Sequence, residues 1–451
     1  MSRKWKIISV LALVLIALQL LRPSIPNKPA TAEIQAPPEV KQVLEKGCYS
    51  CHSDQAKLAW FDQVVPAYWL VRHDVLTARE HLDFSTLGAK PAAVQKAKLY
   101  EAVNMIQLGA MPLPQFAALH PEARLTADDV ATLKAYLHPW GALPVQAQAP
   151  GSSSAVHGFA PLAAVAPALN GVAFEPAFPE WGLVSITDRG DNNTFRFVLG
   201  NDVAMQAIAS GKITPWPDGT KFAKVAWKKQ LGADGIVRPG DYAQVEFMIK
   251  DAGRYKSTDG WGWARWVGPD WKPYGANAEF VNECTSCHQP VRRNDFVYTL
   301  PITASHVDGA EIVNNRAALP NGLPYQPFGW RPVTEYVDPK TLTTAALFGN
   351  DEAMRAVKAW NASGRSGTPA YGAGSVLALV TWVQRDDPHW FGARVPDLPR
   401  TVEFLSIGAQ GSPDAYRRFA GSGLNEEHVD AQASLPREGW MRGLTPVELP
   451  W

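Results

Sequence analysis

The sequence has no excess of charge of either sign. Lysine and arginine together number 43, aspartate and glutamate together also number 43, and the formal net charge at pH 7 is therefore zero. A protein that recruits nucleic acid electrostatically needs a basic surface, so this composition gives a nucleic-acid partner no support. A chain of 451 residues is long enough for two or three domains.

Cysteine is also scarce. The four cysteines all fall in two Cys-x-x-Cys-His units, namely Cys48, Cys51 and His52, then Cys284, Cys287 and His288. This spacing is typical of covalently attached c-type haem, because two thiols add to the two vinyl groups and the adjacent histidine ligates the iron. A zinc site built from both pairs and a redox dithiol are the alternatives, but neither explains a histidine directly after each pair. The sequence therefore predicts two c-type haems, with His52 and His288 as iron ligands.

The longest apolar run, Ile7 to Leu21, is shorter than the roughly 20 residues of a membrane-spanning helix. Lys4 and Lys6 precede it, and c-type haem is attached outside the cytoplasm, so residues 1–32 are expected to be an export signal or a retained membrane anchor. The Ala30-Thr31-Ala32 stretch resembles a cleavage site but lies far from the end of the run. We expect a periplasmic protein, tethered to the inner membrane where this segment is retained.

Helical patterns surround the first haem unit. Apolar residues at helical spacing precede it, namely Val40, Val43 and Leu44. Thr126 and Asp129 resemble a capping box that opens a later helix. Residues 142–158, which include three consecutive serines, lack periodicity and are typical of a linker. Residues 33–141 are therefore predicted to form a small all-α cytochrome domain.

Residues from about 33 to 140 resemble the short haem-binding domain family. The matching features are the first Cys-x-x-Cys-His unit, Pro66, Tyr68, Trp69, the run Leu82 to Ser85, Met111-Pro112 and His120-Pro121. The resemblance implies monohaem electron transfer. A methionine beside a proline is a rigidly placed thioether, so Met111 is the expected sixth iron ligand, with His73, His81 and His120 as alternatives.

Beyond the linker, short apolar alternations broken by glycine and proline indicate antiparallel strands. Asp218-Gly219 predicts a turn, followed by a strand from Lys221 to Lys228 in which Lys224 and Lys221 lie on opposite faces. Parity alone does not say which face is buried. The predicted fold class is multidomain α+β: the all-α cytochrome domain, a mainly antiparallel β haem domain over 159–320, and a second similar β domain without haem over 321–451.

Residues from about 160 to 310 resemble the cytochrome P-460 family, whose haem is attached by Cys-x-x-Cys-His and cross-linked to a lysine. The matching blocks are Gly200-Asn201-Asp202, Trp216 to Thr220, Lys250-Asp251, Arg254-Tyr255, Gly260 to Trp263, and Cys284 to His288. In the family, the lysine follows an Asp-Gly-Thr turn at the spacing of Lys224. The resemblance thus implies that Lys224 modifies the haem, with Lys221 as the nearest alternative.

The same resemblance implies an iron with His288 as its proximal ligand and an open distal face, where family members oxidise hydroxylamine. Catalysis there needs Lys224 and a distal proton acceptor, for which Glu279 and Glu246 are the candidates. Related proteins without the cross-link bind nitric oxide or carbon monoxide. The alternative function is therefore a non-enzymatic gas-binding or electron-transfer cytochrome.

The remainder of the chain echoes the haem domain. Gly349 to Met354 repeats Gly200 to Met205, Gly374 to Trp382 parallels Gly219 to Trp227, and Val402 to Phe404 parallels Val245 to Phe247. Leu379 stands in the place of Lys224, and no haem motif follows. This pattern predicts a degenerate second copy without haem, serving as an internal pseudo-dimer partner; a homodimer is the alternative.

Together these features predict an oxidoreductase. It is a periplasmic dihaem cytochrome that oxidises hydroxylamine, or a related small nitrogen compound, at a lysine-modified haem and passes electrons through the N-terminal haem. Its expected partners are the small nitrogen substrate or gas ligand and an electron-accepting cytochrome or membrane redox chain.

Overall fold

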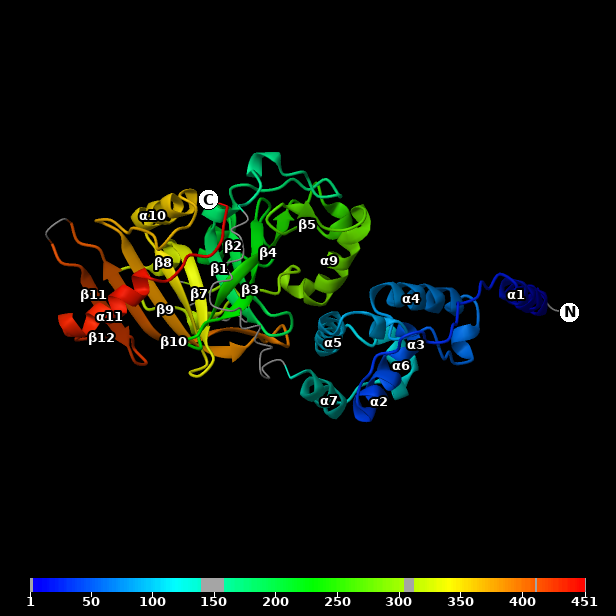
Figure 1. The fold of residues 1–451 in the computed structure, drawn as a ribbon. Coiled ribbons are helices and arrows are strands. Elements are labelled where there is room, and N and C mark those ends of the chain that lie inside the picture. The colour runs from blue at the N-terminus through cyan, green and yellow to red at the C-terminus, as the bar shows by residue number, and fades with distance from the viewer. Residues whose placement is uncertain (1–2, 139–157, 304–311, 410–411, 451) are drawn as a thin grey trace. The chain divides into compact units, whose positions relative to one another are not determined.

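The computed structural model describes residues 3–138, 158–303, 312–409 and 412–450. Two compact units divide the chain, Met1–Pro139 and Trp140–Trp451 (Figure 1). All but the last residue of the predicted linker, 142–158, lies outside the described residues. Each unit is therefore considered by itself.

The first unit is helical, as predicted. Its helices are α1 (Arg3–Gln19), α2 (Pro38–Gly47), α3 (Tyr49–His52), α4 (Ala67–His81), α5 (Ala92–Gln107), α6 (Pro114–Leu119) and α7 (Ala127–Leu137). The predicted apolar face of α2 is buried, and the capping box at Thr126 and Asp129 opens α7 with both reciprocal hydrogen bonds. Both local predictions are confirmed, because capping and helical spacing depend only on neighbouring residues.

Helix α1 is apolar, and most of its large hydrophobic side chains are exposed. Among the described residues, no helix combines the length and the apolar character that crossing a membrane requires.

The second unit is built on antiparallel strands. These are β1 (Gly182–Arg189), β2 (Thr194–Gly200), β3 (Lys221–Leu231), β4 (Val237–Lys250), β5 (Trp261–Val267), β6 (Lys272–Pro273), β7 (Arg331–Asp338), β8 (Thr343–Gly349), β9 (Val376–Asp386), β10 (Ala393–Ser406), β11 (Ala415–Ala420) and β12 (Asn425–Glu427). Its helices are α8 (Asp202–Ala209), α9 (Val281–His288), α10 (Asp351–Ala362) and α11 (Ala431–Arg442). The mainly antiparallel β architecture is confirmed.

The two halves of this unit have the same construction. Strands β1 and β7 each contain 8 residues, β2 and β8 each 7, β3 and β9 each 11, and β4 and β10 each 14. In each half the asparagine before the helix accepts a backbone hydrogen bond from inside that helix and another from the following strand: Asn201 in the first half and Asn350 in the second. The echo in the sequence is therefore a structural repeat.

The repeats were predicted as successive domains, but they share one closed sheet. Strand β4 pairs with β7 through Val237 and Val337, and β10 pairs back to β1 through Asp188–Arg394 and Arg189–Ala393. Eight strands thus form a barrel, with β5 and β6 branching from β4, and β11 and β12 from β10. The physical reason is that each four-stranded half exposes two edges, and the other half satisfies their backbone groups.

A core shared by both halves fills the barrel, and it includes Val225 and Trp227 from the first half and Val380 and Trp382 from the second. Separate clusters cover the outer faces. Helices α8 and α9 pack over the outer face of the first half, while α10 and α11 pack over that of the second. The sheet is consequently buried on both sides, which places β3 between two apolar layers.

Candidate haem sites

The first Cys-x-x-Cys-His unit spans the junction of α2 and α3. The backbone N–H groups of Cys51 and His52 both donate to the carbonyl of Cys48, at 3.2 and 2.9 Å, so the unit forms a tight helical turn. The Nδ1 atom of His52 lies 2.9 Å from the carbonyl oxygen of Leu82. With Nδ1 donating to a carbonyl, Nε2 is the nitrogen that can ligate iron. Burial lowers the pKa of His52, which favours the neutral, metal-binding form of the ring.

The four cysteines of the two Cys-x-x-Cys-His units form no disulfide, and each is half-buried. Burial raises the pKa of Cys48 to about 12 and those of Cys51 and Cys284 to about 11. Redox dithiols instead carry a cysteine of lowered pKa. The environment of these thiols therefore disfavours a redox dithiol function.

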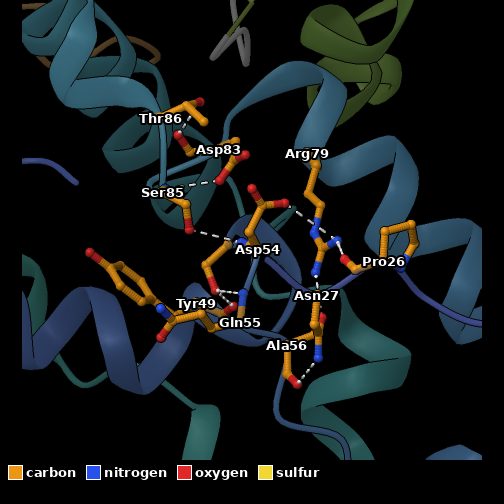
Figure 2. A network of polar contacts seen from close by, with 11 residues as sticks. Pro26, Asn27, Tyr49, Asp54, Gln55, Ala56, Arg79, Asp83, Ser85 and Thr86 are labelled. Atoms are coloured by element: carbon orange, nitrogen blue, oxygen red, sulfur yellow. Dashed lines mark hydrogen bonds and ion pairs between the residues drawn. The ribbon is translucent and has the colours of Figure 1, made fainter. Parts of the chain in front are cut away.

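The loop after His52 is tied to the segment that follows α1 (Figure 2). The guanidinium of Arg79 lies between Asp54, at 3.6 Å, and the Pro26-Asn27 segment, where it donates to the Pro26 carbonyl and to Asn27 Oδ1 at 3.2 Å. The Lys28 N–H donates to the Asp54 carbonyl at 3.0 Å. Residues between α1 and α2 are thus bound directly beside the first haem unit.

The predicted sixth ligand of the first haem, Met111, is half-buried in the connection between α5 and α6. Among the alternatives, His120 has both ring nitrogens occupied, by Asp62 and by Glu122, each at 3.1 Å. His73 and His81 are exposed. These contacts disfavour His120, and Met111 stays a prediction.

The second unit lies on α9, which ends at His288. The Nδ1 atom of His288 is 2.7 Å from the carbonyl oxygen of Phe296, and the rings of Trp263 and Tyr298 lie 4.5 and 5.0 Å from the imidazole ring. Burial lowers the pKa of His288 to about 4, so the ring is neutral. The Tyr298 hydroxyl donates to the carbonyl of Cys287 at 2.6 Å. Both haem units therefore present a neutral histidine with Nδ1 fixed by a carbonyl.

Lys224 lies in a row of charges on three adjacent strands. Its register partner on β4 is Glu246, whose partner on β5 is Arg265. The Lys224 Nζ atom is 2.6 Å from Glu246 Oε2, and Arg265 Nε is 3.6 Å from Glu246 Oε1. The charges of all three act on the pKa of His288 and on that of Cys284. The fold therefore brings this row beside the second haem unit.

The row is partly buried, and this changes its protonation. Burial lowers the pKa of Lys224 to about 8, helped by Arg196 and Arg265 and opposed by Glu246. For Glu246, burial would raise the pKa, but Arg265, Lys224 and Arg196 together hold it well below its usual range. Glu246 is thus a carboxylate, and Lys224 loses its proton more readily than an ordinary lysine does.

The two competing residues lie elsewhere. Lys221 is on the opposite face of β3, where its Nζ atom is 2.6 Å from Glu175 Oε1, and both residues line a cleft. Glu279 is exposed on a short helical turn before α9. The fold therefore brings together Lys224 and Glu246 with the haem unit, and leaves Lys221 and Glu279 outside this group.

Two arginines of the site, Arg196 on β2 and Arg265 on β5, were not anticipated from the sequence. Arg196 is buried, and both side chains act on Glu246. A signal was present, because each is a lone charge inside an otherwise apolar, aromatic strand. A buried charge requires a partner of opposite sign, so such positions indicate a polar cluster.

The second half holds a different arrangement at the equivalent place. Leu379 occupies the position of Lys224 and pairs in register with Glu403, the counterpart of Glu246. Glu403 accepts two hydrogen bonds from Arg437 of α11, both at 2.7 Å, and one from the Tyr416 hydroxyl at 2.6 Å. In the second half, α11 therefore supplies the positively charged partner of the glutamate. Helix α11 covers the face that corresponds to the one covered by α9 in the first half.

Comparison with protein families agrees with this division. Residues 11–139 match the family model described as Haem-binding domain, and residues 176–299 match the family model described as Cytochrome P460. The first match contains Cys48, Cys51 and His52, and the second contains Lys224, Glu246 and the second Cys-x-x-Cys-His unit. No curated protein matches the chain.

Proposed function

With a haem-binding domain followed by a Cytochrome P460 domain in one chain, we propose that this protein is a periplasmic dihaem c-type cytochrome that oxidises hydroxylamine or a related small nitrogen compound. Oxidation takes place at the haem held by Cys284, Cys287 and His288, and electrons leave through the N-terminal haem. The observation that carries the proposal is the pair Lys224 and Glu246, 2.6 Å apart and beside the predicted proximal ligand.

The bound haem supplies an iron that accepts a nitrogen lone pair and takes up electrons singly. Oxidation of hydroxylamine releases more than one electron and also protons. A second haem in the same chain suits this stoichiometry, because the haem that oxidises the substrate must pass on each electron before it can accept the next one. The side chains of the protein then have two tasks, which are to bind the substrate and to accept its protons.

Glu246 is the proton acceptor in this proposal. Arg265, Lys224 and Arg196 keep its carboxylate ionised, and because they lower its pKa they also make it a weak base, so it accepts a proton only from a substrate that oxidation has made strongly acidic. The ion pair with Arg265 at 3.6 Å and a hydrogen bond from the Gln244 amide orient the carboxylate. The same cations would orient the lone pairs of a small polar substrate.

Lys224 is the residue proposed to modify the haem. Bonding its amine nitrogen to the macrocycle would replace a C–H bond there and release two protons and two electrons, and an external two-electron oxidant must take up the electrons. The amine must be neutral for this step, and burial lowers the pKa of Lys224 to about 8, which favours the neutral form. Lys221 lies on the opposite face of the strand and is ion-paired with Glu175. The structure therefore supports Lys224 over Lys221.

The ion pair itself favours a second candidate function. A Lys224 ammonium retained by Glu246 would leave the haem unmodified, and the site would then bind nitric oxide or another gas without turnover. The two functions differ in the covalent state of Lys224, which a spectrum reports.

The test is the ferrous absorption spectrum of the full chain with Lys224→Leu, compared with wild type and with the matched control Lys221→Leu. Proposed lysine modification predicts a red-shifted Soret band in wild type and in Lys221→Leu that is absent from Lys224→Leu. Hydroxylamine-dependent reduction should be lost together with that band. An ordinary c-type spectrum in all three proteins would contradict lysine modification and favour the gas-binding function.

Replacement of Glu246 with glutamine is expected to lower the rate of hydroxylamine oxidation by about 10²- to 10⁴-fold, because a positioned general base contributes on this scale. The shape of the side chain is kept while its proton affinity is removed. Turnover is measured with an excess of electron acceptor, and the exposed Glu279→Gln serves as control. An equal loss in both variants would rule out a specific role for Glu246.

We also propose that the protein stays tethered to the inner membrane by its N-terminal segment. Removal at Ala30–Ala32 would discard Pro26, Asn27 and Lys28, which bind Arg79 and Asp54 beside the first haem unit (Figure 2). The family match also begins at residue 11, inside α1. Both observations support retention over cleavage.

A further inference from the structure

The loop that follows α9 carries two consecutive residues in the left-handed backbone region. Asp295 has a φ of 46° and Phe296 a φ of 66°. This region is sterically unfavourable for residues with a Cβ atom, particularly for a bulky aromatic one, and persists only where the surroundings impose it. The consequence of this conformation is visible at Phe296, whose carbonyl oxygen lies 2.7 Å from Nδ1 of His288.

The Asp295 carboxylate holds this loop against the sheet. Its Oδ2 atom accepts the backbone N–H of Trp216 at 2.9 Å, while its Oδ1 atom accepts from Lys250 Nζ at 2.7 Å and from Trp261 Nε1 at 3.3 Å. Both Asp295 and Lys250 are nearly buried, with side-chain exposures of 11% and 9%. Three separate segments, the turn before β3, the end of β4 and the start of β5, therefore converge on one side chain.

The first haem unit has no comparable strain. His52 donates to the carbonyl of Leu82, which has an ordinary extended backbone with φ −154° and ψ 117°. The two histidines thus make the same kind of hydrogen bond by different means. At His288, the position of the acceptor carbonyl depends on the left-handed backbone conformation that the surroundings impose on Phe296.

We propose that Asp295 is a positioning residue for the proximal ligand of the second haem. By holding Phe296 in its left-handed conformation, Asp295 keeps a carbonyl on Nδ1 of His288. A strong hydrogen bond at Nδ1 makes the imidazole a better electron donor and so stabilises ferric iron, which lowers the reduction potential. This inference rests on haem attachment at Cys284 and Cys287, and it is independent of whether hydroxylamine is the substrate.

Asp295→Asn is the informative change. The amide keeps the size of the carboxylate, but one of its two ends is now a donor, facing either the Trp216 N–H or the Lys250 ammonium. One of the holding contacts is therefore lost. Asp259→Asn is the matched control, because Asp259 also has a left-handed backbone, with φ 55°, but an exposed side chain.

The experiment is a spectroelectrochemical titration of both haems in the full-length dihaem protein, with the iron–histidine stretching band recorded by resonance Raman spectroscopy. Asp295→Asn is expected to shift the ferric/ferrous equilibrium of the second haem at least tenfold toward ferrous iron, which is about 59 mV for one electron. The iron–histidine band should move to lower frequency. The first haem, and both haems of Asp259→Asn, should keep their wild-type values.

An unchanged potential and iron–histidine band at the second haem of Asp295→Asn would overturn the proposal, and so would equal shifts at both haems. Where Asp295→Asn does not take up haem, Lys250→Met is measured in its place, since it leaves the contacts of Asp295 with Trp216 and Trp261. A smaller shift of the second haem in the same direction supports the role of Asp295. A wild-type potential in Lys250→Met contradicts it. Hydroxylamine turnover enters none of these readouts, so failure of the proposed function would not affect the result.

Discussion

Replacing Cys284 and Cys287 together with serine is expected to lower the covalent haem content from two per chain to one. The reason is that thioether formation needs both thiols at the spacing of the helical turn, and all four cysteines of the chain belong to the two haem units. Only the haem at Cys284 and Cys287 should be lost, because Cys48 and Cys51 lie in the other compact part of the chain. Covalent haem is measured by the alkaline pyridine spectrum and by intact-mass analysis after denaturation.

The reciprocal variant, with Cys48 and Cys51 replaced, provides the matched control. It should also retain one haem, and the proposed modification by Lys224 predicts that only this variant keeps the red-shifted absorption. Hydroxylamine should still reduce its remaining haem once, but electron delivery to an external acceptor should slow. Two haems remaining in either variant would mean that the Cys-x-x-Cys-His units are not the attachment points.

Replacing Arg437 with leucine is expected to destabilise the barrel unit by about 3 kcal/mol, because the change leaves a buried carboxylate without its partner. Glu403 is only 3% exposed and receives both of its charge-assisted hydrogen bonds from Arg437, at 2.7 Å each. The Tyr416 hydroxyl compensates only in part. Denaturant unfolding followed by tryptophan fluorescence measures the free energy of unfolding.

The exposed pair Arg417 and Glu426 is a suitable control. Their side chains are 44% and 49% exposed at a separation of 2.7 Å, so Arg417→Leu should cost less than about 1 kcal/mol. The double replacement Glu403→Leu with Arg437→Leu should recover most of the lost stability, since no buried charge is then left alone. Similar losses in Arg437→Leu and Arg417→Leu would show that the Glu403 pair is not specially stabilising.

The two halves of the duplicated architecture differ at equivalent positions. Both halves keep a glutamate at the same register position, Glu246 and Glu403, but their partners differ. In the first half a lysine from the adjacent strand lies opposite the glutamate, and α9 carries Cys284, Cys287 and His288. In the second half a leucine faces it and α11 contributes Arg437. In the second half, the same strand framework therefore serves to stabilise the barrel.

Local sequence determined the features that depend on short spacing. Each Cys-x-x-Cys-His unit folds as one helical turn, the capping box opens α7 as expected, and the turn before β3 positions Lys224 on the strand. The repeat was also readable, because equal strand lengths keep the spacing between matching blocks similar. These features need only neighbouring residues or internal similarity.

Only the tertiary structure decided which residues meet. Strand parity separated Lys224 from Lys221 but did not say which side faces the haem unit, because β3 is covered by apolar layers on both faces. Arg196, Arg265 and Asp295 come from segments far apart in the sequence, and their roles follow from strand pairing and loop closure. The merging of two predicted domains into one barrel has the same origin, since edge strands are satisfied by whichever partner the fold brings to them.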